Sequence, residues 1–135
     1  MTTPPRHAKR GANAVEFALV LPLLLMFLGG IFDYSIYFMT RSATYRAALE
    51  GARAGAMGDV ITAPGLAEAA FRSSLIAHGY DDSTTTVTSS LVMINSERNV
   101  SMDVETPFTP PFGLASVIVP TSVRFTLSMR LEDQG

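Results

Sequence analysis

Residues 17–32 form an almost unbroken apolar run, and a lone carboxylate, Glu16, stands directly in front of it. Counted from Ala12, the stretch has 21 residues, of which only Asn13 and Glu16 are polar. At about 1.5 Å per residue, a helix of this length spans about 30 Å, the thickness of the hydrocarbon layer of a bilayer. The sequence therefore predicts a transmembrane helix over residues 12–32.

The charges around this segment predict its orientation. Arg6, Lys9 and Arg10 precede it, and positively charged flanks favour the cytoplasmic side. We expect a single-pass helix with a cytoplasmic N-terminus and an external C-terminal part. A cleaved secretory signal is the alternative, but residues 32–38 are rich in large aromatic side chains and offer no small-x-small cleavage site. A retained anchor is the better interpretation.

Glu16 needs a partner, because a carboxylate inside a membrane segment is destabilising by about 2.5–3.5 kcal/mol at the helix centre and by less near the interface. If a peptidase cut after Gly11, the new α-amine of Ala12 would lie one helical turn from Glu16, on the same helix face. Each charge would then have an obvious partner, in its own chain or in a neighbouring one.

The sequence around this point resembles a known family. Residues 10–22 read Arg-Gly-Ala-Asn-Ala-Val-Glu-Phe-Ala-Leu-Val-Leu-Pro, so a basic leader ends in a glycine and a glutamate is the fifth residue after the glycine. This pattern is similar to the processing site of type IV prepilins. The wider stretch closely resembles TadE-like proteins of the tight-adherence pilus system, called Tad or Flp, and the specific part of the resemblance covers roughly the first 40 residues.

The resemblance implies a processed pilus subunit. An aspartic prepilin peptidase would cut between Gly11 and Ala12, and Glu16 with Phe17 would provide the counter-charge and the assembly contact. Removal of residues 1–11 would leave seven basic and twelve acidic residues, a net charge of −5. The implied function is that of a minor pilin or pseudopilin that helps to initiate, cap or assemble a Tad pilus for surface adherence.

The same resemblance implies partners and a location. The partners would be the prepilin peptidase, other minor and major pilins, the inner-membrane assembly platform of the pilus, and the membrane. The location would be the bacterial inner membrane, with incorporation into the pilus as a further alternative. The chain is longer than the short major pilins and shorter than relatives with a large adhesion domain. Its length therefore matches both TadE and TadF, and its residues do not distinguish between the two.

Helical signals continue beyond the membrane segment, and the sequence predicts one helix over residues 12–57, about 69 Å long. Pro22 is interpreted as an ordinary membrane-helix kink, with local melting for exit from the bilayer as the alternative. Small residues recur at every fourth position of the second half, which allows close approach of another backbone. We expect this face to pack on the chain's own C-terminal part rather than on another subunit. The two rows are Ala43, Ala47, Gly51 and Gly55, and Ala48, Ala52 and Ala56.

Residues 58–135 predict a small α+β domain outside the membrane. Residues 58–65, with Pro64, break the helical pattern, and residues 66–78 read as a short amphipathic helix closed by Gly79. The period then changes to two, which is typical of strands. The expected strands are 84–95, 100–106 and 121–132, with a hairpin turn at 96–99.

The fold class is therefore α+β: a long N-terminal transmembrane helix packed against a short helix and an antiparallel sheet of about three strands. Between the second and third strands, residues 107–120 form an apolar loop that contains several prolines. A lid over the core is the preferred interpretation of this loop, and an exposed contact patch is the alternative.

The sequence offers no constellation of residues for catalysis or metal binding. Cysteine is absent, His7 lies in the expected leader and His78 stands alone. Asp103 and Glu105 share a strand face, for which solvation is a simpler explanation than acid–base chemistry. We predict a protein that is not an enzyme, has no catalytic residues and binds neither metal nor cofactor. It also lacks the basic face of a nucleic-acid binder.

A signal-anchored periplasmic binding or sensor domain, never processed, is the second interpretation of the whole chain. It accounts equally well for the membrane segment and the sheet. It treats the spacing of Gly11 and Glu16 as coincidence.

Overall fold

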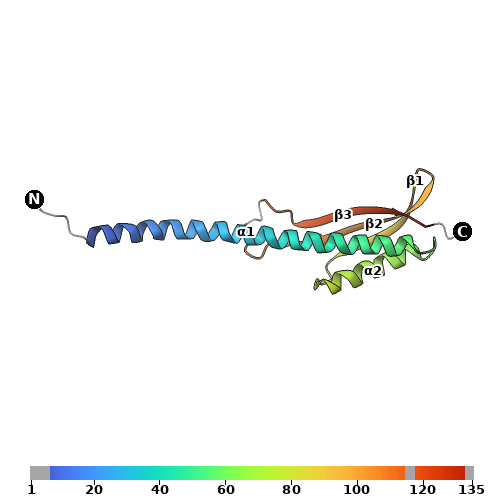
Figure 1. Cartoon of the computed structure of the whole chain (residues 1–135), viewed down its shortest axis with the longest axis horizontal. Helices are drawn as coiled ribbons and strands as arrows, with labels where there is room; N and C mark the ends of the chain where they lie inside the picture. Colours follow the sequence, from blue (N-terminus) through green and yellow to red (C-terminus); the bar gives the residue numbers. More distant parts are fainter. Residues whose placement is uncertain (1–6, 115–117, 133–135) are drawn as a thin grey trace, which may run out of the picture.

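A single long helix extends through the molecule and carries a small body of one further helix and one sheet along its second half (Figure 1). The computed structural model describes residues 7–114 and 118–132, with side chains from Asn13 onward. The fold is α+β, as predicted. The elements in chain order are α1 (His7–Ala56), α2 (Ala63–Ala77), β1 (Thr86–Ile94), β2 (Glu97–Pro107) and β3 (Ser122–Arg130).

α1 is a continuous helix of 50 residues that passes through Pro22. It begins at His7, before the expected start at residue 12, because Ala, Lys and Arg in this stretch favour helix. Every residue from Asn13 to Leu28 is exposed, and buried positions begin at Gly29. An 18-residue window of this helix has a mean hydropathy of 2.3 with 6% of the window buried. The first half of α1 is thus apolar and long enough to cross a membrane, and lies outside the core of the body.

The second half of α1 packs closely against α2 and β2 through its small residues. Ala47 and Ala48 are fully buried. A Cβ added to Gly51 would lie 2.7 Å from the carbonyl oxygen of Ala67 in α2 and 2.9 Å from Cε of Met102 in β2. Only glycine therefore fits at position 51 without a shift of the neighbouring backbone.

Replacing Gly51 with alanine is expected to lower the free energy of unfolding by about 1–3 kcal/mol, because the added methyl group overpacks a contact with backbone. Gly30→Ala is the matched control in the same helix, since a Cβ there would have no atom within 4 Å apart from its own turn of helix backbone. Thermal unfolding of the full chain in detergent micelles, followed by circular dichroism, measures both variants. Equal midpoints would contradict the close contact at Gly51.

The prediction that Pro64 lies in the break before α2 is wrong. α2 begins at Ala63, so Pro64 lies in its first turn. Proline suits this place because its missing N–H would have no partner in the helix anyway. The other end matches the prediction: Gly79 has φ 82°, and its N–H donates to the carbonyl of Ile76 at 2.8 Å. With the Tyr80 N–H donating to Leu75 at 3.2 Å, these bonds form a Schellman cap.

The sheet is antiparallel with strand order β1-β2-β3. The hairpin turn expected at residues 96–99 is wrong by one residue at its start and three at its end. Ile94 pairs with Glu97, and the chain turns through Asn95 and Ser96, whose φ angles are 53° and 66°. Two left-handed residues form the tight turn whose twist matches the flanking strands. Residues 97–99 are consequently part of β2.

The core lies between the two helices and one face of the sheet, in two clusters. The larger cluster centres on Phe71 and Leu75 of α2 and on Val100, Met102 and Val104 of β2, all fully buried. The smaller cluster lies towards the middle of α1 and consists of Tyr37, Phe108, Val119 and Val123. β3 alternates between side chains packed on these clusters and exposed ones, as predicted.

Candidate functional site

The residues expected to form the processing site lie on the exposed first half of α1. Gly11 and Ala12 belong to the helix, which runs without a break across the bond between them. Their side chains, and residues 1–6 of the expected leader, lie outside the described part of the chain. Glu16 is exposed and Phe17 is 64% exposed. Both are accessible to lipid or to another subunit.

A belt of large apolar side chains surrounds this half of α1. Leu19 is 74% exposed, and Leu23 and Phe27 are 69% exposed. An apolar surface of this extent is typical of membrane or protein contacts. The same surface suits lipid and the helices of other subunits, because both environments exclude water.

A buried carboxylate, Asp33, marks the point where the apolar segment meets the body. Asp33 is completely buried. Its Oδ1 accepts the backbone N–H of Phe112 at 2.8 Å, and its Oδ2 accepts the N–H of Leu114 at 3.0 Å. Hydrogen bonds to a charged acceptor are about twice as strong as neutral ones. The β2–β3 loop is therefore fastened to α1 through its backbone.

Sequence reasoning missed Asp33 as a functional residue, although a signal was present. Asp33 is the only charged residue in the 24-residue stretch 17–40. The argument that Glu16 needs a partner applies to it equally. Two of its partners are backbone N–H groups 79 and 81 residues further along the chain.

The β2–β3 loop lies along α1 at the end of the apolar segment. A Cβ on Gly29 would lie 2.5 Å from Cδ1 of Leu114, and the rings of Phe32 and Phe112 are 6.2 Å apart. Phe108 and Val119 are buried in the smaller core cluster, as a lid would be. Between them the loop exposes apolar side chains: Phe112 (59%), Leu114 (42%) and Ile118 (81%).

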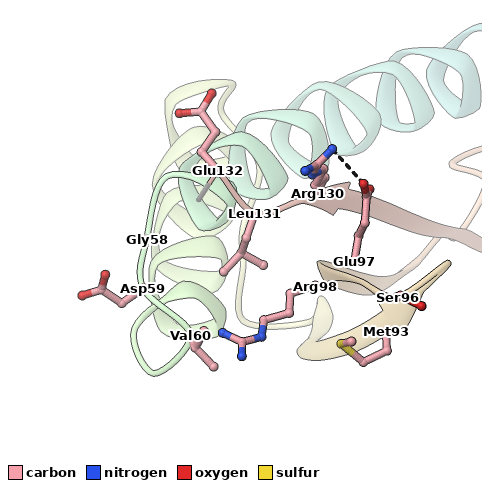
Figure 2. Close-up of a pocket in the computed structure, with 10 residues that line it drawn as sticks. All are labelled: Gly58, Asp59, Val60, Met93, Ser96, Glu97, Arg98, Arg130, Leu131 and Glu132. Atoms are coloured by element: carbon pink, nitrogen blue, oxygen red, sulfur yellow. Dashed lines mark ion pairs between the residues drawn. The ribbon is translucent and has the colours of Figure 1, made fainter. Parts of the chain in front are cut away.

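An open hollow of about 600 Å³ lies at the opposite end of the body (Figure 2). Arg130 and Glu97 form an ion pair across its wall, with 2.9 Å between Nη1 and Oε1. Both side chains are largely exposed, so the pair contributes little to stability. Within the described residues no group of His, Cys, Asp or Glu could hold a metal ion. The lining residues are Gly58, Asp59, Val60, Met93, Ser96, Glu97, Arg98, Arg130, Leu131 and Glu132.

The two carboxylates that share a face of β2 have partners on β3. Glu105 forms an ion pair with Arg124, and Asp103 accepts a hydrogen bond from the Thr126 hydroxyl at 3.3 Å. The hydrogen bond and the positive charge of Arg124 lower the pKa of Glu105 below its usual value. A carboxylate that is held ionised in this way suits cross-strand pairing better than proton donation.

The match to a known protein family lies within the long helix α1. Residues 11–53 match the model of a family described as TadE-like protein. No curated protein and no solved structure matches the chain. The matched segment includes Gly11, Glu16 and Asp33 and all but the last member of each row of small residues, and it ends three residues before the C-terminus of α1. The resemblance seen in residues 10–22 is confirmed.

Proposed function

We propose that this chain, whose residues 11–53 match the TadE-like family, acts in the Tad system as a processed minor pilin or pseudopilin. In this role it would help to initiate, cap or assemble the Tad pilus used in surface adherence. The observation that carries the proposal is the order Gly11, Ala12, Glu16, Phe17 at the start of an exposed, membrane-length helix. TadE-like pilus proteins are not enzymes in general, and the proposal includes no catalytic step.

In this proposal, three segments of the chain have different roles. Residues 1–11 would be the leader, residues 12–57 the long helix, which ends at Ala56 in the structure, with the membrane segment 12–32, and residues 58–135 the external domain. The basic residues of the leader favour a cytoplasmic N-terminus in the bacterial inner membrane. The prepilin peptidase would remove the leader there. The partners that follow are other minor and major pilins and the assembly platform.

Cleavage creates the charge that Glu16 needs. The new α-amine of Ala12 would lie one turn before the carboxylate, or in a neighbouring subunit at the same level of the membrane. Either arrangement neutralises two charges in an apolar environment where each alone is unfavourable. Pairing between subunits would also fix the register of adjacent helices.

The intact mass of the protein from its native membranes tests processing. We expect the wild-type chain to begin at Ala12 and a Gly11→Arg variant to remain uncut, because a bulky charged side chain replaces the cleavage-site glycine. Gly30→Ala is the control and should be processed like the wild type, since its surroundings are open. An uncut N-terminus in all three proteins would overturn the proposal and favour the signal-anchored periplasmic domain.

A further inference from the structure

We propose that the tip of the β2–β3 loop, formed by Phe112, Leu114 and Ile118, inserts into the membrane face next to the body. The inserted tip would fix the depth at which the body sits on the bilayer. The occupant proposed for this apolar surface is lipid. The proposal does not depend on cleavage or on pilus formation.

The position of the loop tip along α1 is the first argument. Leu114 lies over Gly29, and the Phe112 ring lies near Phe32. Both helix residues belong to the apolar segment 12–32, and Gly29 is the first buried residue in the described part of α1. The body therefore overlaps the last turn of the membrane segment instead of beginning after it.

The length of the apolar segment places this overlap at membrane depth. As a helix, residues 12–32 span about 30 Å, the thickness of the hydrocarbon layer. The contacts of the loop tip at residues 29–32 fall within this span. Residues 108–121, which connect β2 to β3, also contain no charged side chain. Loop and helix thus present one continuous uncharged surface.

The backbone N–H groups of residues 110–114, in the described part of the loop tip, suit a medium without water. In lipid, backbone polar groups must be satisfied within the protein, because lipid offers them no partner. Pro110 and Pro111 have no N–H. The next three N–H groups all have acceptors: those of Phe112 and Leu114 bond to Asp33, and that of Gly113 bonds to the carbonyl of Pro110 at 3.2 Å. From residue 110 to residue 114, every backbone N–H is satisfied.

The groove between the loop tip and α1 fits an acyl chain. It has a volume of about 380 Å³ and is lined mainly by apolar side chains from Met26, Phe27, Ile31, Leu114 and Ile118. Tyr34 lies at the same groove, and tyrosine is enriched where a membrane meets water. The groove continues the exposed apolar surface of residues 13–28, which a membrane-spanning helix presents to lipid.

Single-tryptophan variants test the insertion, since the chain contains no tryptophan of its own. Full-length Phe112→Trp and Ile118→Trp would be reconstituted in vesicles of phosphatidylcholine and phosphatidylglycerol with brominated acyl chains, which quench nearby tryptophan. Leu24→Trp, in the membrane segment, is the positive control. Ile61→Trp, at a residue that is 92% exposed at the far end of the body, is the negative control.

We expect both loop-tip variants to lose about half of their emission, between the strong loss of Leu24→Trp and the unchanged emission of Ile61→Trp, as interfacial tryptophans would. Unquenched emission at a long wavelength from both loop-tip variants would show that the loop tip is in water. Unquenched emission at a short wavelength that depends on the protein-to-lipid ratio would show that a second copy covers it. Either result, with Leu24→Trp quenched, would overturn the proposal.

Discussion

Cells that carry Glu16→Ala are expected to keep the protein in the inner membrane and to lose Tad pili. Alanine is apolar, so insertion of the helix does not suffer and one unfavourable charge is removed. Assembly loses the counter-charge for the α-amine created by cleavage. A loss of only about 1.4 kcal/mol would reduce incorporation about tenfold, and an α-amine left without a counter-charge in an apolar environment is more unfavourable than that. Membrane fractionation and counts of pili by electron microscopy measure the two effects separately.

Glu50→Ala is the matched control for this experiment. Glu50 is also an exposed glutamate of α1, but it lies beside the body and beyond the apolar segment. Its removal is expected to leave pilus numbers unchanged. Wild-type piliation with Glu16→Ala would refute the counter-charge role. Loss of the protein from the membrane in that variant would instead show that Glu16 acts in insertion.

The long helix and the strand pattern were predictable because they depend on local periodicity. The apolar run and the small-residue rows predicted α1 over most of its length, and alternation predicted β3 with its two faces. The errors in the predicted element boundaries lie where the backbone conformation of one or two residues determines where an element begins or ends. Pro64 reads equally well as a helix breaker and as a first-turn residue, and the hairpin shortens because Asn95 and Ser96 both accept positive φ.

Contacts between distant parts of the chain were not predictable. Gly29 and Gly30 are adjacent in the sequence, yet an added Cβ would contact the β2–β3 loop only at Gly29. Asp33 could be recognised from the sequence as a carboxylate that needs partners, but not as one whose partners are backbone N–H groups of that loop. Neither relation has a period or a motif, because each depends on how the loop folds back on α1.

Glu16 and Asp33 lie at the two ends of the apolar segment, and their carboxylates differ in the partners that the chain provides for them. Glu16 is exposed on a bare helix, so its counter-charge must come from the chain terminus or from another subunit. Asp33 is buried and bonded to its own chain. One carboxylate is thus suited to assembly, and the other to holding the body at a fixed place on the helix.

Asp33→Ala is expected to release the β2–β3 loop from α1. The N–H groups of Phe112 and Leu114, which are part-buried, would lose their acceptor, and a donor left without one is destabilising by about 1–3 kcal/mol when water cannot reach it. Local opening would become easier by about 2–4 kcal/mol in total, since the loop can partly relax. Amide hydrogen exchange at Phe112 and Leu114, measured by NMR on the full chain in micelles, should accelerate about thirtyfold or more.

Two further variants separate the carboxylate from the general effect of altering this turn of the helix. Ser35→Ala changes an exposed residue whose hydroxyl bonds only within α1, to the carbonyl of Ile31 at 2.8 Å, and should leave both amides protected. Asp33→Asn keeps one oxygen acceptor and should expose one of the two amides more than the other. If exchange at both amides is unchanged in Asp33→Ala, the carboxylate does not hold the loop, and the aromatic and apolar contacts along residues 29–37 must do so.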